Sequence, residues 1–430
     1  MKDQLVHLSL QGPARKAVTV LPLVVALAAV WFSSRWFIGN TIAGNISADD
    51  RGLENAQLAV NLAPSDPLAH WTLAEIEQSK LPLDQSNHAL VEYEQAVKLA
   101  PHDYRFWLAW GRALEQADDI KGGEQAMRRA VELAPSYSYP RWYLGNLLLR
   151  DGRSNEAFEE FRRASDADPQ LRGQVFNLIW QVYGKDAAQL AAAIGPDASR
   201  RAEFAKYLVE RNLLEPGLNL WRSLSATEKE ANSEMGATLI TTLANNKQYP
   251  HAFEVWNDLL KPAGSAHAGE VLNGGFEQDS RQLGDIFGWQ LRSNSQAQTT
   301  YDRDVRHGGA QSLRIIFKAK AKVEFGLSQL VVVQPGAQYD FEGFYRTSKL
   351  ESGATPMIEI ADAIDGAVLA TGPAATVGIN DWQRISFPFK AGAKTEAVII
   401  RLNRASCGED QTCPIFGTVW YDDFNIKRRG

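Results

Sequence analysis

Cysteine, histidine and methionine are scarce in this chain, and the sequence motifs of several large enzyme classes are missing. Among 430 residues there are two cysteines, seven histidines and four methionines. No GxGxxG, GxxxxGKS/T, GxSxG or HExxH motif occurs, and the histidines are scattered from His7 to His307 without the spacing of metal ligands. The sequence therefore predicts no catalytic site and no required cofactor.

Carboxylates are also missing in the arrangement that glycoside hydrolysis needs. Adjacent residues such as Asp422 and Asp423 point to opposite faces of a strand, and Glu159 and Glu160 point in different directions around a helix. A glycosidase requires two carboxylates that face each other across a cleft. An enzyme of unrecognised type stays open as a third hypothesis, which would need a polar cleft with convergent titratable groups.

The charge of the chain is mildly acidic. The formal net charge is -6 and the sequence pI is near 5.8. No stripe rich in lysine and arginine interrupts this balance, whereas a nucleic-acid-binding protein needs a basic surface. We therefore expect no nucleic acid among the partners.

One long apolar stretch lies near the N-terminus. No charged residue occurs from Ala17 to Ser34, which is long enough to cross the hydrocarbon layer of a bilayer. Basic residues precede the stretch and aromatic residues gather at its far end (Arg15 and Lys16; Trp31, Phe32, Trp36 and Phe37). The sequence predicts a transmembrane anchor at 17–38 in the cytoplasmic (inner) membrane, with residues 1–16 cytoplasmic and the main body periplasmic or extracytoplasmic.

A cleaved signal peptide is the alternative interpretation of the same stretch. A basic start, an apolar run and Ala26-Leu27-Ala28 satisfy the signal-peptide pattern loosely. The hydrophobicity that continues from Val30 to Ile38 favours an anchor. Under both interpretations everything after about residue 40 is exported.

The two cysteines, Cys407 and Cys413, enclose the short polar loop GEDQT. A disulfide between them suits an oxidising compartment. Zinc or CxxC redox chemistry is excluded by the spacing and by the lack of a nearby histidine. Two free thiols remain the alternative.

Prolines mark a helical repeat. Pro101, Pro135 and Pro169 stand 34 residues apart, and Pro64 lies one slightly longer interval upstream. Between them small and bulky residues recur, and the last clear unit has Leu144, Gly145, Leu148, Gly152, Ala157, Phe161, Ala164 and Pro169. These positions resemble the tetratricopeptide consensus, in which Gly and Ala let two helices approach closely and proline stops the second helix.

The resemblance implies an α-solenoid of helix pairs over residues 48–262. The clear repeats cover 67–169, with degenerate units before and after. Residues 48–64 have the pattern of only the second helix of a partial first unit. A protein partner is expected in the concave groove, where the candidates are Trp110, Arg112, Tyr143 and Asn146. For Trp110 and Tyr143, packing between repeats is the alternative role.

The pattern changes after a linker at 263–270, which is rich in Ala and Gly. From 271 to 430, at least seven short alternating runs are separated by turn residues, which predicts an antiparallel β-sandwich. The whole chain is thus expected to be a multidomain α-then-β protein: an N-terminal transmembrane helix, an α-solenoid and a jelly roll.

Six features occur in order along the C-terminal part: NGGFE (273–277), Trp289, HGGAQSLRI (307–315), VQPGAQYDFEGFYR (333–346), DWQRISFPF (381–389) and WYDDFNI (420–426). They resemble the jelly-roll carbohydrate-binding modules of the galactose-binding-like superfamily, the group that includes families four, nine and twenty-two. The resemblance is specific for fold and much less so for ligand.

Two expectations about sites follow from this resemblance. Glu277 and Asp423 match positions that help to hold a structural calcium, with capping of turns as the alternative role. Sugar binding needs aromatic faces and planar polar groups; the candidates are Trp289, Tyr301, Tyr345, Arg346, Glu359 and Arg401. A packing role for Trp289 stays open, and Trp382, Trp420 and Tyr339 are expected in the core.

The predicted function is a membrane-anchored, non-catalytic scaffold. Its repeats would bind a protein and its sandwich a polysaccharide, in the assembly or export of a bacterial cell envelope or exopolysaccharide. The alternative is a membrane-tethered adaptor whose sandwich is a structural or protein-docking module with no sugar ligand.

Overall fold

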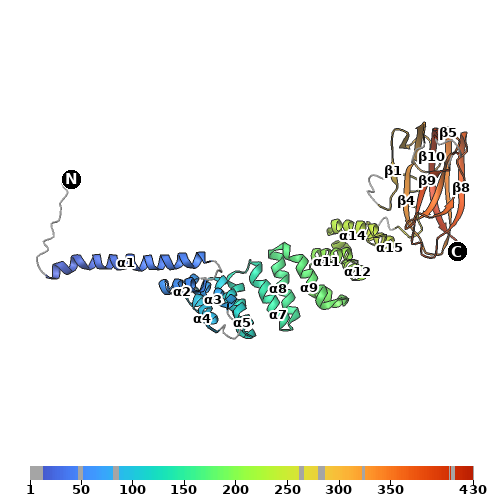
Figure 1. Ribbon diagram of the computed structural model, residues 1–430. Coiled ribbons are helices and arrows are strands. Elements are labelled where there is room, and N and C mark those ends of the chain that lie inside the picture. The colour runs from blue at the N-terminus through green and yellow to red at the C-terminus, as the bar shows by residue number, and fades with distance from the viewer. Residues whose placement is uncertain are drawn as a thin grey trace, which may run out of the picture. The chain divides into compact units, whose positions relative to one another are not determined.

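A computed structural model describes residues 13–46, 52–80, 87–260, 266–278, 286–321, 325–405, 407 and 412–429 (Figure 1). By its contacts the chain divides into two units, residues 1–195 and 196–430. Helices make up the first unit, and the second contains further helices followed by two antiparallel sheets. The expected fold class, α then β, is confirmed.

Helices follow one another from α1 (Pro13–Asn45) to the end of the first unit. They are α2 (Gly52–Leu62), α3 (Pro67–Lys80), α4 (Asn87–Leu99), α5 (Tyr104–Gln116), α6 (Ile120–Leu133), α7 (Ser138–Arg150), α8 (Ser154–Ala167), η2 (Pro169–Leu171), α9 (Arg172–Tyr183) and α10 (Ala187–Ile194). The second unit begins with α11 (Ala198–Glu210), α12 (Leu214–Arg222), α13 (Ala226–Ala231), α14 (Ser233–Asn245) and α15 (Tyr249–Leu259).

The repeat prolines end helices as the sequence predicts. Each stands two residues after the last residue of the second helix of a pair: Pro64 after α2, Pro101 after α4, Pro135 after α6 and Pro169 after α8. Proline cannot continue a helix because it lacks the N–H and clashes with the preceding turn. Helices α3 to α8 therefore form three successive hairpins.

Small residues set the distance between the two helices of a hairpin. A Cβ added to Gly111 of α5 would lie 3.0 Å from the carbonyl oxygen of Gly123 in α6. A Cβ added to Gly145 of α7 would lie 2.8 Å from the ring of Phe161, which is fully buried in α8. Only glycine allows this approach, so the ring fills the space that a side chain would need.

The same packing continues into the end of α1. A Cβ at Gly39 would lie 2.7 Å from the Cβ of Ala63, and Ala43 is buried beside Ala59 and Ala69. The last turns of α1 are therefore the first helix of the partial first repeat, which the sequence did not reveal. The apolar pattern continues along the whole of α1, so the sequence does not show where the exposed part ends and the part that packs in the first repeat begins.

The rest of α1 exposes apolar side chains. Val20–Asn45 is long and apolar enough to cross a membrane, and it is the one such helix among the described residues. Leu21 is 64% exposed and Phe32 66% exposed, and most other apolar side chains along this part of the helix are exposed as well. Exposure of so many contiguous apolar groups costs free energy in water.

Two five-stranded antiparallel sheets form the C-terminal sandwich. The first sheet has the order β1 (Gln290–Arg292), β4 (Gly326–Val332), β9 (Ala397–Arg404), β6 (Pro356–Asp362) and β7 (Val368–Thr371). The second sheet has the order β2 (Ala297–Asp302), β3 (Ser312–Ala319), β10 (Ile415–Arg428), β5 (Gln338–Ser352) and β8 (Gly378–Lys390). Alternate residues of both sheets meet in one core, with Ile358 and Ile400 from the first and Phe341 and Tyr421 from the second.

Helix α15 packs against the sandwich within the second unit. The ring of Phe287 lies 5.1 Å from Phe253 and 5.5 Å from Trp256. Part of the expected linker, 263–265, lies outside the described residues. Ala266 exchanges two hydrogen bonds with the Asn257 side chain, and the Gly269 N–H donates to the Val332 carbonyl. Residues 266–269 are thus bonded both to the helix and to the first sheet.

A disulfide joins Cys407 and Cys413, as expected. The side chain of Arg404, largely buried, lies 2.7 Å from the sulfur of Cys413. Burial lowers the pKa of Arg404 because the charged form loses its water. The bond suits an oxidising compartment.

Replacing Gly145 tests the packing of the helical hairpins. We expect Gly145→Ala to lower the free energy of unfolding of the helical part by about 1–3 kcal/mol, because the new methyl group overlaps a buried ring. The measurement is denaturant unfolding followed by far-ultraviolet circular dichroism. Gly173→Ala is the matched control, since a Cβ there meets nothing within 4 Å. Equal stability of the two variants would contradict the packing.

Candidate functional site

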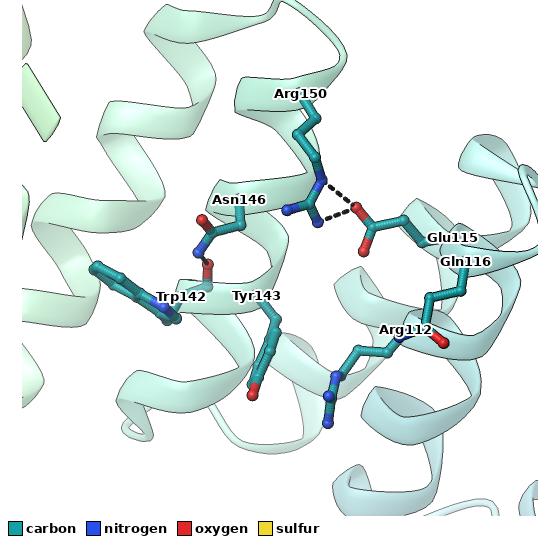
Figure 2. A pocket seen from close by; sticks show the side chains of 7 residues that line it. All are labelled: Arg112, Glu115, Gln116, Trp142, Tyr143, Asn146 and Arg150. Atoms are coloured by element: carbon teal, nitrogen blue, oxygen red, sulfur yellow. Dashed lines mark hydrogen bonds and ion pairs between the residues drawn. The ribbon is translucent and has the colours of Figure 1, made fainter. Parts of the chain in front are cut away.

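A groove of about 500 Å³ runs over the first helices of two repeats (Figure 2). Its lining comes from α5 and α7: Arg112, Glu115, Gln116, Trp142, Tyr143, Asn146 and Arg150. A second hollow shares Arg112 and Gln116 and continues onto α3 through Glu75, Gln78 and Ser79. The groove therefore follows the first helix of each of three successive hairpins.

Charged and aromatic side chains meet in this groove. The guanidinium of Arg112 lies 4.5 Å from the ring centroid of Tyr143, which is a cation–π distance. Arg150 is paired with Glu115, as Figure 2 shows. Among the described residues no carboxylate forms an ion pair with Arg112, so this cation keeps its donors available for a ligand.

Hydrogen bonds fix the neighbouring polar groups. The Asn146 amide donates to the Trp142 carbonyl at 2.8 Å (Figure 2), a bond that does not use the carbonyl oxygen of the Asn146 side chain. The Tyr93 hydroxyl donates to Gln78 at 2.8 Å, and burial raises the pKa of Tyr93, with the nearby Glu75 adding to the effect. Tyr93 is therefore a neutral support beneath the hollow.

The structure brings three of the four predicted groove residues together. Arg112, Tyr143 and Asn146 all line the groove. Trp110 does not line it: its ring lies 5.7 Å from Trp107 and packs against the core between the repeats. This matches the packing alternative for Trp110. Glu115 and Arg150, absent from the prediction, become neighbours only because α5 and α7 lie side by side.

The six predicted sugar-binding residues do not form one site. Trp289 and Tyr345 lie in the core, 3% and 5% exposed. Trp289 packs against Phe276 and Phe424 and donates its N–H to the Asn273 carbonyl at 3.1 Å. Both rings are enclosed by protein, so neither offers a face for a sugar, and Trp289 has the packing role that the sequence left open.

Tyr301 and Arg346 belong to the second sheet. Tyr301 of β2 is partly buried and packs against the core. Arg346 of β5 points outward, with its side chain 40% exposed, and lies 3.6 Å from Asp381. Only Arg346 of this pair reaches solvent with a planar polar group.

Glu359 and Arg401 are neighbours on the outer face of the first sheet. Arg401 Nε donates to Glu359 at 2.6 Å, and the Asn403 amide donates to the same carboxylate at 2.8 Å. The Glu359 side chain is only 7% exposed. The Glu359–Arg401 pair is thus satisfied within the sheet, on the face opposite to that of Arg346.

Trp382 and Trp420 are not core residues, contrary to the sequence prediction, whereas Tyr339 is. Trp420 alternates with the buried Val419 and Tyr421, so its ring must point to the outside of the second sheet. Trp382 contacts His307 on the same outer face. The period-two pattern of each strand contained this information, but large apolar side chains favour a core assignment.

Glu277 and Asp423, the predicted calcium ligands, lie at one glycine-rich corner. Both carboxylates come within 4 Å of the point where a side chain at Gly275 would begin. Glu277 accepts from the Ala310 N–H at 2.9 Å, and Asp423 accepts from His307 Nδ1 at 2.7 Å. Two converging carboxylates suit a hard cation.

The rest of a calcium shell would have to come from backbone or amide oxygens or from water. Within the described residues no group of three or more His, Cys, Asp or Glu side chains is placed to hold a metal. The neighbouring Asp422 is fully buried and accepts from the N–H groups of His307 and Gly308. Burial raises its pKa despite these bonds, and the two bonds tie Asp422 to the backbone of residues 307–308.

Residues 269–408 match a family of carbohydrate-binding domains. No curated protein matches the chain. Among solved structures, "CBM4 structure and function" is 15% identical, with 37% of this chain and 99% of that chain covered and a TM-score of 0.29. The family match at 269–408 confirms the expected resemblance of the sandwich to carbohydrate-binding modules.

Repeat proteins are similar to the helical part. MamA (41-end) from Desulfovibrio magneticus RS-1 is 22% identical, with 32% of this chain and 76% of that chain covered and a TM-score of 0.28. YrrB, titled a TPR protein with an unusual peptide-binding site, is 18% identical, with 48% of this chain and 83% of that chain covered and a TM-score of 0.26. None of these matches is to a catalytic domain.

Calcium dependence tests the glycine-rich corner. If Glu277 and Asp423 hold the ion, calcium will raise the thermal midpoint of the second unit and a chelator will reverse the rise, because an ion that binds only the folded state stabilises it. Glu277→Gln should abolish the shift. Glu351→Gln, on β5 away from this corner, should keep it. An equal response to calcium in both variants contradicts the assignment.

Proposed function

We propose that the protein is a non-catalytic scaffold in the cytoplasmic membrane whose repeats hold a protein segment and whose sandwich holds a polysaccharide. The place of action would be the assembly or export of a bacterial cell envelope or exopolysaccharide. The observation that carries this proposal is the carbohydrate-binding domain match at 269–408, downstream of a helical groove and an exposed apolar helix.

The groove supports a peptide-like ligand. The guanidinium of Arg112 lies over the ring of Tyr143 and has no ion-pair partner among the described residues. The Asn146 side chain donates its N–H to Trp142, and that bond does not use its carbonyl oxygen. An extended peptide presents carbonyl, N–H and carboxylate groups that such a set can bind. Trp142, also in the lining, adds apolar contact.

The geometry of α1 supports the anchor over a cleaved signal peptide. The helix is continuous from Pro13 to Asn45, and its last turns are packed into the first repeat. Cleavage after Ala28 would leave Val30, Trp31 and Phe32 exposed to water at the new end. With the helix in a bilayer, the repeats would begin directly at the membrane surface.

A protein-docking sandwich is the second candidate. The observation in its favour is that the sandwich already makes an aromatic contact with helices, through Phe287 between Phe253 and Trp256. The Lys247 ammonium and the Tyr249 hydroxyl also donate to backbone carbonyls of the turn after β6. Such a module would need no sugar ligand.

Membrane topology is the first test of the proposed location. If α1 is an anchor, a reporter that is active only after export should be active when it is fused after Gly430. The fusion protein should also remain in the membrane fraction after alkaline or high-salt washing. Deleting residues 1–38 should release the protein into the soluble fraction. A fusion that is exported but soluble, shortened by the length of a signal peptide, contradicts the anchor.

Site-specific crosslinking tests the groove in living cells. A photoreactive residue replacing Asn146 should form a discrete covalent product with one protein, because the position lines the groove. Glu159 on α8 is the matched control: its side chain is 49% exposed and lies outside the groove. Arg112→Glu should remove the product by reversing the charge. Identical crosslinks at both positions would reject the groove as the binding site.

A further inference from the structure

The aromatic side chains that the strands of the sandwich direct outward lie on one of its two outer faces; Phe416 is exposed, and Phe344, Trp382 and Trp420 are partly buried. The strands of the first sheet contain no Phe, Tyr, Trp or His. In the second sheet, Phe344, Trp382, Phe416 and Trp420 point away from the core residues with which they alternate. The face that holds Glu359 and Arg401 therefore has no ring on its strands for a sugar to stack on.

Two rings and one imidazole are in contact on the outer face of the second sheet, and a third ring lies on the same face. His307 stacks on Phe344 with ring centroids 3.7 Å apart, and its edge meets Trp382 at 5.6 Å. Trp420 lies on the central strand β10, two strands from Trp382 on β8, which is about 10 Å across a sheet. We call Trp420, Trp382, His307 and Phe344 the aromatic face.

Planar polar groups flank the aromatic face. Trp420 lies opposite Arg314 on one neighbouring strand and Arg346 on the other. The Trp420 N–H and the Arg314 guanidinium both donate to Asp302, at 2.9 and 3.1 Å. Burial opposes the charge of Asp302, but the bond from Trp420, the backbone N–H groups of residues 304 and 305 and the charge of Arg314 outweigh it and keep the pKa of Asp302 below its usual value. The carboxylate therefore orients both side chains.

The charges around the aromatic face are paired, whereas three outward lysines (Lys318, Lys390 and Lys427) lie near strand ends and form no ion pair among the described residues. Each outward arginine is paired with a carboxylate: Arg314 with Asp302, Arg346 with Asp381, Arg384 with Glu342 and Arg429 with Asp340. Paired charges around the aromatic face give a polyanion no strong local attraction. The paired groups do offer many donors and acceptors at fixed positions beside apolar rings, the combination that sugar hydroxyls and the C–H face of a pyranose require.

We propose that the aromatic face of the second sheet is the glycan-binding site and that its ligand is a neutral polysaccharide. Sugar rings would stack on Trp420 and Trp382, and the flanking Arg314–Asp302 and Arg346–Asp381 pairs would bind their hydroxyls. A chain of several sugar units can contact both indoles. This inference rests on the proposed glycan-binding function and names its site and the class of its ligand.

Calorimetric titration of the full chain in detergent micelles tests the site. The neutral probes are soluble xylan, mixed-linkage β-glucan and β-1,4-galactan, and the acidic probe is alginate. We expect saturable binding of at least one neutral polymer and none of alginate. Trp420→Ala and Trp382→Ala should each weaken binding at least tenfold, while Met357→Ala, on the outer face of the first sheet, should leave it unchanged.

Trp420→Phe keeps the test valid where the alanine variant fails to fold, because it retains a flat ring and loses only the N–H. It should bind within about threefold of the unmodified protein, since stacking depends on the ring face. If Arg401→Ala loses binding while Trp420→Ala and Trp382→Ala bind as the unmodified protein does, the glycan lies on the first sheet. That result would overturn the proposed site and leave the glycan-binding function standing. Preference for alginate would overturn the ligand class. No binding of any polymer by the unmodified chain would overturn the glycan-binding function itself.

Discussion

The face-to-face packing of the two sheets is the interaction on which the rest of the account depends. Strand geometry sends alternate side chains inward, and the inward set includes Tyr339, Tyr345 and Tyr421, each at most 5% exposed. Once these rings are enclosed, they are unavailable to a ligand. What remains outside is therefore decided by the register of each strand, and Trp382 and Trp420 are among the side chains left there.

The helical part is also held together by close packing around buried rings. Glycine and alanine at hairpin contacts bring backbones together, as Gly39 with Ala63 and Gly111 with Gly123 show, and buried rings fill the space beside them. Because the packing is repeated, the first helices stand side by side and expose a continuous groove. The end of α1 takes part in this array, which joins the exposed apolar helix to the first repeat without a break.

Much of the architecture could be predicted from the sequence, because periodic features leave strong signals. The proline interval gave the ends of α4, α6 and α8, and alternation gave the sandwich. Features that depend on long-range pairing could not be predicted. Glu115 meets Arg150 only when two repeats stack. The outer position of Trp420 depends on the strand register, whereas the hydrophobicity of its side chain by itself favours a core position. The sugar candidates were scattered over the core and two faces for the same reason.

Hydroxyl-radical footprinting of the full chain with and without a neutral oligosaccharide tests the central claim most directly, since it compares both faces of the sandwich in one sample. The account predicts that saccharide protects Trp382 and Trp420 from oxidation and leaves Met357, on the outer face of the first sheet, unchanged. Protection of Met357 with unchanged tryptophans would contradict it, as would equal oxidation of all three residues at a saturating saccharide concentration.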